Sequence, residues 1–319
     1  MIQVRVATLL PSATEIVCAL GARSELVGRS HECDHPHDLG DVPVLTRARV
    51  GPLPSSKAID AGVRAMLADA LAIYEVDLDR LKEARPDVVV TQDLCDVCAV
   101  SLDDVRAAVA RLARADVRIV SLHPTRLEDI WADIARVADA LGRADHGRSL
   151  VERLRARVAR IEERALDALR EAARPTTLTI EWIDPVMVGG LWMPELVALA
   201  GGEALVTKPA EHAPTLTRAQ LAELDPDVVI VKPCGFTLER TLLELSVLED
   251  VLPWRSWRAV ADGKVFVADG NAFFNRSGPR IVESLEIMAA CVHPEAFRDF
   301  AHAHRESYVR VDRDMVIQR

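Results

Sequence analysis

Aromatic side chains are scarce in this sequence: phenylalanine, tryptophan and tyrosine together make up 4% of its 319 residues. Half of the residues are nonetheless hydrophobic. Aliphatic side chains must therefore form most of the core, and the chain is long enough for two domains of ordinary size. Long apolar runs are also missing, since none approaches the roughly 18 residues that mark a transmembrane helix. We therefore expect no membrane-spanning segment.

A basic segment is lacking as well. The formal net charge is −10, which argues against binding to nucleic acid or to an anionic membrane surface. The arginines recur at helical spacing beside aspartate and glutamate, and this pattern is typical of solvated helix faces.

The first ten residues do not resemble a secretory leader. They carry no basic region, no long apolar stretch and no small-residue cleavage site. We therefore expect a cytoplasmic protein, or a periplasmic one if a leader has been removed. In the cytoplasm the six cysteines would be thiols or metal ligands rather than disulfides.

Motifs of nucleophilic or metal-dependent catalysis are absent from the sequence. It contains no Gly-x-Ser-x-Gly elbow, no phosphate-binding glycine-rich loop and no His-Glu-x-x-His. We expect a binding protein rather than an enzyme. Redox or metal-dependent chemistry at the cysteines remains the alternative.

The sequence does contain one repeated segment, with similar copies at residues 81–91 and 221–231. Each copy joins a helix end to Pro-Asp and then to a short β-branched run. Proline ends the helix, and the run that follows is typical of a buried parallel strand. We expect an α/β fold of two similar Rossmann-like lobes with parallel sheets. Chance recurrence of a common connection is the alternative explanation.

A long helix is predicted between the two halves, from about residue 144 to residue 173. Its apolar residues recur every three or four positions on a charged background. Thirty residues would span roughly 45 Å, which suits a rigid connection between lobes better than a surface helix within one domain. We expect lobes at 1–141 and 175–319, with a connecting segment at 142–174.

Ligands of parallel sheets bind beyond the carboxyl ends of the strands. The loops at those ends contain polar residues and an unusual share of the few aromatic ones, which would suit a large, flat, partly apolar ligand between the lobes. Packing of the lobes could also account for the aromatics. The candidate ligand-binding residues are Pro11, Ser12, Ala13, Thr14, His31, Glu32, Gln92, His123, Glu181, Trp182, Trp192, Lys232, Phe236, Phe273, Phe274 and Arg276.

Four cysteines fall in the same loops, namely Cys33, Cys95, Cys98 and Cys234. Cys-x-x-Cys can hold a soft metal ion, form a redox disulfide or bind an iron–sulfur cluster. We expect these four to converge as metal ligands and to react with thiol reagents before the other two cysteines, which lie on apolar helix faces. The alternative is that they only fill the wall of the ligand site.

The chain resembles the helical-backbone (class III) substrate-binding proteins of ABC transporters, most of all those for cobalamin (vitamin B12). The resemblance covers nearly the full length. It is carried by residues 6–15, the strand at 26–29, residues 81–91 and 121–127, the long helix and the repeat at 221–231.

This resemblance implies two α/β lobes on a rigid helix and a small-molecule ligand, a corrinoid or similar metal chelate, with an ABC permease as a potential partner. The missing leader and the Cys-x-x-Cys depart from the family pattern. They favour, as an alternative, a cytoplasmic protein or enzyme that binds a metal ion or an iron–sulfur cluster through the cysteines. We expect a monomer.

Overall fold

The computed structural model describes residues 4–49, 53–68, 74–92, 106–107, 110, 116–170 and 173–318. The chain divides into two compact units. Unit 1 comprises Met1–Pro54, Ala58–Pro124 and Glu128–Leu154, and unit 2 comprises Ser55–Lys57, Thr125–Leu127 and Arg155–Arg319. The division between residues 154 and 155 falls inside α6 (Ala144–Ala168). This helix therefore contributes residues to both units.

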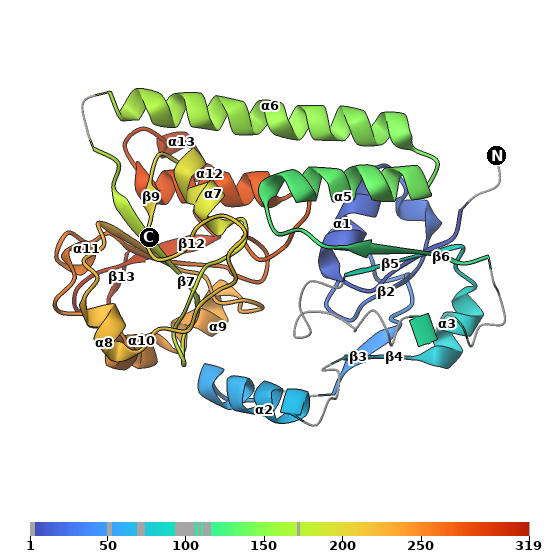
Figure 1. The fold of residues 1–319 in the computed structure, drawn as a ribbon, viewed down its shortest axis with the longest axis horizontal. Helices are drawn as coiled ribbons and strands as arrows, with labels where there is room; N and C mark the ends of the chain where they lie inside the picture. The colour runs from blue at the N-terminus through green and yellow to red at the C-terminus, as the bar shows by residue number, and fades with distance from the viewer. Residues whose placement is uncertain are drawn as a thin grey trace. The chain divides into compact units, whose positions relative to one another are not determined.

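The described part of unit 1 contains a four-stranded parallel sheet in the order β2-β1-β5-β6 (Figure 1). Its strands are β1 (Val6–Thr8), β2 (Leu26–Arg29), β5 (Val88–Gln92) and β6 (Arg118–Leu122). A separate antiparallel pair is formed by β3 (Thr46–Ala48) and β4 (Tyr74–Val76). Every residue of β1 and β5 is buried, as expected for central strands of a parallel sheet.

Helices cover this sheet on both faces (Figure 1). The helical segments are α1 (Pro11–Ala19), the 3₁₀ turn η1 (Arg23–Glu25), α2 (Ser56–Ala68), α3 (Leu78–Ala84), α5 (Leu127–Ala140) and the first part of α6. Leu81 and Ala84 of α3 pack with Ala7, Leu9 and Val89 of the sheet region in one buried cluster.

Unit 2 contains a larger mixed sheet, in the order β13-β12-β11-β10-β7-β8, with β9 also paired to β7. Strands β7, β9, β10 and β11 run parallel, whereas β8, β12 and β13 pair antiparallel to their neighbours. The strands are β7 (Thr176–Trp182), β8 (Met187–Val188), β9 (Glu203–Ala204), β10 (Val228–Val231), β11 (Val265–Ala268), β12 (Tyr308–Val311) and β13 (Ile317–Gln318).

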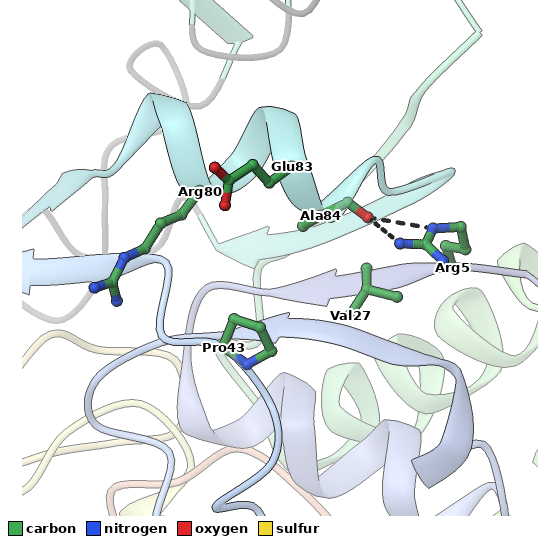
Figure 2. A pocket seen from close by; sticks show the side chains of 6 residues that line it. All are labelled: Arg5, Val27, Pro43, Arg80, Glu83 and Ala84. Carbon is green, nitrogen blue, oxygen red and sulfur yellow. Dashed lines mark hydrogen bonds between the residues drawn. The ribbon is translucent and has the colours of Figure 1, made fainter.

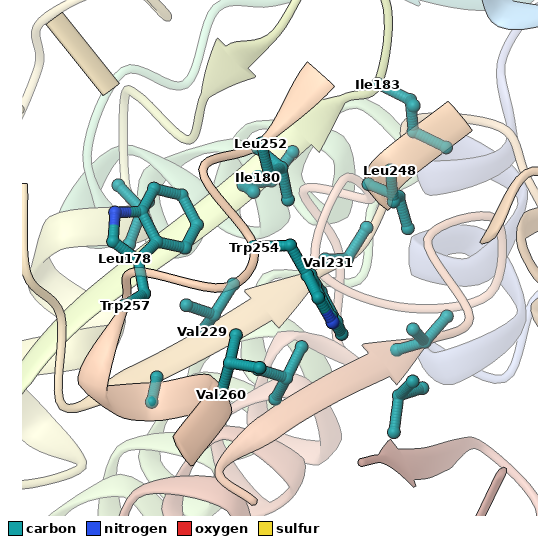
Figure 3. Close-up of a cluster of buried hydrophobic side chains, with 14 of the residues drawn as sticks. Leu178, Ile180, Ile183, Val229, Val231, Leu248, Leu252, Trp254, Trp257 and Val260 are labelled. Atoms are coloured by element: carbon teal, nitrogen blue, oxygen red, sulfur yellow. The ribbon is translucent and has the colours of Figure 1, made fainter. Parts of the chain in front are cut away.

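One face of this sheet packs against a cluster of aliphatic and tryptophan side chains (Figure 3). Trp254 and Trp257, each 2% exposed, lie with Leu178, Val229 and Val231 of the strands. The helices of unit 2 are α7 (Met193–Leu199), α8 (Arg218–Ala222), α9 (Leu238–Leu242), α10 (Leu245–Val251), α11 (Arg258–Ala261), α12 (Ile281–Val292) and α13 (Arg298–Ala303). The second part of α6 belongs to the same unit.

Arginine side chains fasten that part of α6 to α12 and α13. Arg157 donates to Glu283 over 2.9 Å and to Glu286 over 2.7 Å. Arg164 lies over the Phe297 ring, 4.5 Å from its centroid, and donates to the carbonyl of Ala296. The second part of the long helix is thus fixed to unit 2 at two positions.

The repeated Pro-Asp segment makes the same contact in both units. In unit 1, a carboxylate oxygen of Asp87 accepts from the backbone N–H of Arg5 over 3.0 Å, just before β1. In unit 2, one oxygen of Asp227 accepts from the N–H and the hydroxyl of Thr176, the first residue of β7, over 2.9 and 2.8 Å. Each aspartate therefore fixes the start of the strand beside its own.

The structure confirms the predicted α/β fold with parallel sheets, and several predicted strands coincide with observed ones. Two details differ. The long helix ends at Ala168 rather than near residue 173, and the sheet of unit 2 has antiparallel members. Of these, β8 directly follows β7 in the chain and β13 directly follows β12, so neither needs a crossover helix. No helix in the described segments combines the length and apolar character that a membrane crossing requires.

We predict that Asp227→Ala lowers the free energy of unfolding by about 1–3 kcal/mol, because the half-buried N–H and hydroxyl of Thr176 lose their acceptor. Burial acts to raise the pKa of Asp227, but the hydrogen bonds from Thr176 and the charge of Arg258 outweigh it and hold the pKa below its usual value. A lowered folded-state pKa stabilises the fold above the unfolded-state value near 4, and this stabilisation disappears as the pH falls through the folded-state pKa.

Urea unfolding of wild type and variant at neutral and acidic pH measures both effects. Asp262→Ala, at an exposed aspartate, is the control and should stay within about 0.5 kcal/mol of wild type. Equal losses in the two variants, or a loss at Asp227 that persists unchanged at low pH, would contradict the prediction.

Candidate functional site

The loop after β2 carries a hydrogen-bonded group at the carboxyl edge of unit 1. The Nδ1 atom of His31 lies 2.7 Å from the hydroxyl of Thr46, which also accepts from the His31 backbone N–H over 3.0 Å and donates to Ser30 Oγ over 3.1 Å. The His31 ring meets the ring of Tyr74 edge-on at 5.1 Å, and Tyr74 donates its hydroxyl hydrogen to Glu32 over 2.6 Å. The side chains of two predicted residues, His31 and Glu32, are thereby both fixed by contacts with Tyr74.

Electrostatics favour a neutral imidazole in this group. Burial lowers the pKa of His31, and the nearby Glu32 carboxylate only partly opposes that shift. A neutral imidazole is also the form that binds metals.

Thr14 and Cys33 lie deeper in unit 1. The hydroxyls of Thr8 and Thr14 are 2.6 Å apart, and Thr14 Oγ1 donates to Cys33 Sγ over 3.0 Å. Thr14 is fully buried and Cys33 is 4% exposed. These side chains stabilise the junction of β1, α1 and the loop after β2.

The other predicted residues of unit 1 occupy different settings. Pro11 begins α1 and is half-buried, whereas Ser12 and Ala13 are buried. Gln92 ends β5 and is 8% exposed. The His123 side chain is exposed, and its backbone binds Asp133, whose pKa burial raises to about 6 against the opposing charge of Arg136.

A buried lysine organises the carboxyl edge of unit 2. The Lys232 side chain has no exposed area, and its Nζ lies 3.1 Å from Glu181 Oε2 and 3.0 Å from Asn275 Oδ1. Glu181 keeps a quarter of its side chain exposed. The lysine charge is therefore neutralised within the fold, and the carboxylate that neutralises it remains open to solvent.

The loops after β10 and β11 approach each other closely at this lysine. Asn275 donates its amide hydrogens to the carbonyls of Lys232 and Gly270 over 3.2 and 2.9 Å. A Cβ atom at Gly270 would collide with the carbonyl oxygens of Pro233 and Lys232. Glycine is the only residue that lets the two backbones approach this far.

An aromatic pair joins the end of β7 to the loop after β10. Trp182 and Phe236 meet edge-on with centroids 5.2 Å apart, and the Arg240 guanidinium lies 4.5 Å over the Phe236 ring. Trp182 is half-buried, and its indole N–H is buried with no partner in the described part of the chain. The exposed part of the Trp182 ring, rather than its buried N–H, is the surface that a ligand could contact.

The predicted aromatic wall needs correction at two positions. Trp192 is 6% exposed and donates to the backbone carbonyl of Phe274 over 2.8 Å, and Phe274 has no exposed area. Both rings fill the interior of unit 2, so neither has the exposed surface that a ligand contact requires. Arg276 is also buried, whereas Phe273 is half-buried with the Arg280 guanidinium 5.5 Å from its ring centre.

The predicted cysteine cluster gains no support from the structure. Cys95 and Cys98 lie outside the described residues, and in the part described no group of three or more His, Cys, Asp or Glu side chains could hold a metal ion. Cys33 belongs to unit 1 and Cys234 to unit 2. Cys33 is buried while Cys18 is half-buried, which contradicts the expected order of thiol exposure for that pair.

Three residues of the site were not predicted from the sequence. Thr46 and Tyr74 lie on the short pair β3–β4, and neither directly follows a strand of the parallel sheet. Asn275 lies in the same loop as the predicted residues Phe273 and Arg276. Polar residues are common in such loops, so its residue type gave no reason to select it. The Tyr74 position follows from no local sequence signal, because its role depends on a contact with Glu32, 42 residues away.

The structure also contains a cavity on the other side of unit 1. It is lined by Arg5, Val27, Pro43, Arg80, Glu83 and Ala84 (Figure 2). Arg5 precedes β1 and donates to the carbonyl of Ala84 at the end of α3. The cavity thus lies at the amino ends of the strands, away from the loops described above.

Comparison with known proteins gives a consistent set of matches. The family described as "Periplasmic binding protein" matches residues 6–272. Among curated proteins, the chain is 18% identical over 298 residues to the "Uncharacterized ABC transporter substrate-binding lipoprotein YvrC" of Bacillus subtilis (strain 168), covering 92% of this chain and 82% of the relative.

Solved structures are similar over almost the whole chain. A periplasmic heme binding protein from Pseudomonas aeruginosa matches with a TM-score of 0.68 and 20% identity, over 91% of this chain and 93% of that one. The periplasmic vitamin B12 binding protein BtuF of Vibrio cholerae matches with a TM-score of 0.62 and 16% identity, over 90% and 96%. At these identities the likeness concerns the fold.

We predict that Lys232→Met lowers the free energy of unfolding by about 2–4 kcal/mol, because it leaves Glu181 and Asn275 without their buried partner. The methylene stem is kept, so the loss measures the ammonium group. Thermal or urea unfolding of the variant gives the value. Lys264→Met, at an exposed lysine, is the control, and a loss at Lys232 no larger than at Lys264 would contradict the prediction.

We further predict that Gly270→Ala lowers the free energy of unfolding by about 1–3 kcal/mol, because the added methyl group forces apart the loops after β10 and β11. At Gly40 a Cβ atom meets nothing within 4 Å. Gly40→Ala should therefore leave stability unchanged or raise it by up to about 1 kcal/mol. Equal effects of the two substitutions in urea unfolding would count against the close approach.

Proposed function

The chain belongs to the periplasmic binding protein family, the substrate-binding proteins of ABC transporters, and we propose that its ligand is a corrinoid or a similar planar metal chelate. This family consists of binding proteins, not enzymes. The observation that carries the proposal is the half-buried group of His31, Glu32 and Tyr74 at the carboxyl edge of unit 1. It combines aromatic surface with a neutral nitrogen donor.

The relatives support this class of ligand. Proteins of the same fold are described as binding heme or vitamin B12. Both molecules are large and flat and hold a metal at their centre. A site that serves them needs apolar contact with the ring and a few polar groups for its charged substituents.

Unit 2 offers suitable groups at its own carboxyl edge. Trp182 presents a half-buried ring and an indole N–H without a partner among the described residues. Glu181 presents a carboxylate that is a quarter exposed. A corrinoid carries amide side chains, which can donate to the carboxylate, and a flat ring system, which can pack against the exposed part of the indole.

We further propose that the protein works on the outer side of the cytoplasmic membrane and delivers its ligand to an ABC permease. The family description and the lipoprotein relative support this location. The cytoplasmic location expected from the sequence has no support in the comparisons. A monomeric state remains a prediction.

The described residues do not support the alternative function, a metal or iron–sulfur site built from cysteines. The Thr14 hydroxyl donates to Cys33, and this cysteine is buried in unit 1. No observation on the described residues favours a cluster.

We predict that cyanocobalamin, hydroxocobalamin or ferric haem binds with a dissociation constant of about 1 µM or lower, equivalent to about −8 kcal/mol. Isothermal calorimetry and absorbance titration measure it. Trp182→Ala should weaken binding at least about tenfold, a loss of about 1.4 kcal/mol, because a ring contact is removed.

The control is Arg80→Ala in the cavity at the amino ends of the strands, which should bind like wild type. Dissociation constants above about 1 mM for all three compounds would reject the proposal, because such affinity corresponds to only about −4 kcal/mol.

A further inference from the structure

The hydrogen bonds around Thr46 fix the position of the proton on His31. The Thr46 hydroxyl donates its single hydrogen to Ser30 Oγ over 3.1 Å. It therefore has no hydrogen left for His31 Nδ1, which lies 2.7 Å away. In the neutral ring, Nδ1 must then carry the proton and Nε2 must carry the lone pair.

The lone pair on Nε2 is not used within unit 1. No hydrogen bond reaches Nε2 from the described residues, and this atom is not among their buried polar atoms that lack a partner. Nε2 is therefore not completely buried, and the ring as a whole is half-buried. An imidazole held through Nδ1–H, with Nε2 unpaired among the described residues, has the arrangement of a metal ligand with its supporting hydrogen bond.

The ring is also held against rotation. Tyr74 packs edge-on against it at 5.1 Å, and Tyr74 is itself anchored by its 2.6 Å hydrogen bond to Glu32. The backbone N–H of His31 donates to Thr46 as well. An immobilised ligand loses little conformational freedom when it coordinates a metal, which strengthens binding.

We propose that His31 coordinates the metal of the bound chelate through Nε2, as an axial ligand, with Thr46 and Tyr74 as positioning residues. This inference rests on the proposed function. A bare metal ion would need several protein ligands, and the described residues bring no three together. A planar chelate already supplies its equatorial donors and needs only one more, on its open face.

Absorbance titration with hydroxocobalamin and with ferric haem tests the inference. Both have an exchangeable axial position, so wild type should displace bound water and give the spectrum of a nitrogen-ligated metal. His31→Ala should lose that spectrum and bind each compound at least tenfold more weakly. Its affinity for cyanocobalamin, in which cyanide occupies the open face, should match wild type. The two compounds together show whether cobalt, iron or both are accepted.

Further variants separate coordination from damage to the fold. Imidazole added to the His31→Gly variant should restore the nitrogen-ligated spectrum. Thr46→Ser keeps the hydroxyl and should behave as wild type, whereas Thr46→Val should weaken the spectral change. His302→Ala, at an exposed histidine of α13, is the matched control and should change nothing.

Three results would overturn the inference. Binding by wild type without a nitrogen-ligated spectrum, or an unchanged spectrum in His31→Ala, would reject coordination by His31 while the proposed function stands. Absence of binding to all three compounds would reject both.

Discussion

The contact on which both units depend is a hydrogen bond from a strand start to the aspartate of the neighbouring Pro-Asp segment. Asp87 accepts from Arg5, and Asp227 accepts from Thr176. Parallel strands cannot be aligned by a tight turn, so their register needs another constraint. Because each carboxylate fixes one end of its strand pair, it also determines how far the opposite ends extend. The loop that carries Lys232 begins at one of those ends, whereas the loop that carries His31 begins at the end of β2, which pairs with β1.

The sequence predicted the second Pro-Asp strand well because of its burial. Val228–Val231 is a central, fully buried strand of unit 2 and lies where the repeated segment predicted it. Leu26–Arg29, an edge strand of unit 1, was also predicted with the bounds that the structure has. Fully buried strands consist of consecutive apolar residues, and Pro-Asp or a turn marks where they begin. The strands β12 and β13 were not predicted, because β12 alternates polar and apolar residues and β13 has only two residues.

The candidate site was only partly predictable, because burial depends on contacts that are distant in the sequence. The loops were placed correctly from the strand ends, and this placement brought His31 and Lys232 into the candidate set. Residue type alone, however, made Trp192 look like a ligand contact, and the structure buries it against the Phe274 backbone. Thr46 was missed for the converse reason, since a lone threonine has no signal until its three hydrogen-bond partners are known.

Each aspartate forms its strand contact within a single unit, and this has a consequence for how cooperatively the two units unfold. Arg5 and Asp87 both belong to unit 1, and Thr176 and Asp227 both belong to unit 2. Breaking the hydrogen bond of one aspartate therefore removes no contact of the other, and each unit can unfold locally as its own cooperative element. The helix α6 contributes buried residues to both units, with Leu150 and Leu154 in the first and Ile161 and Ala165 in the second. Unwinding of this helix would therefore remove packing contacts from both units.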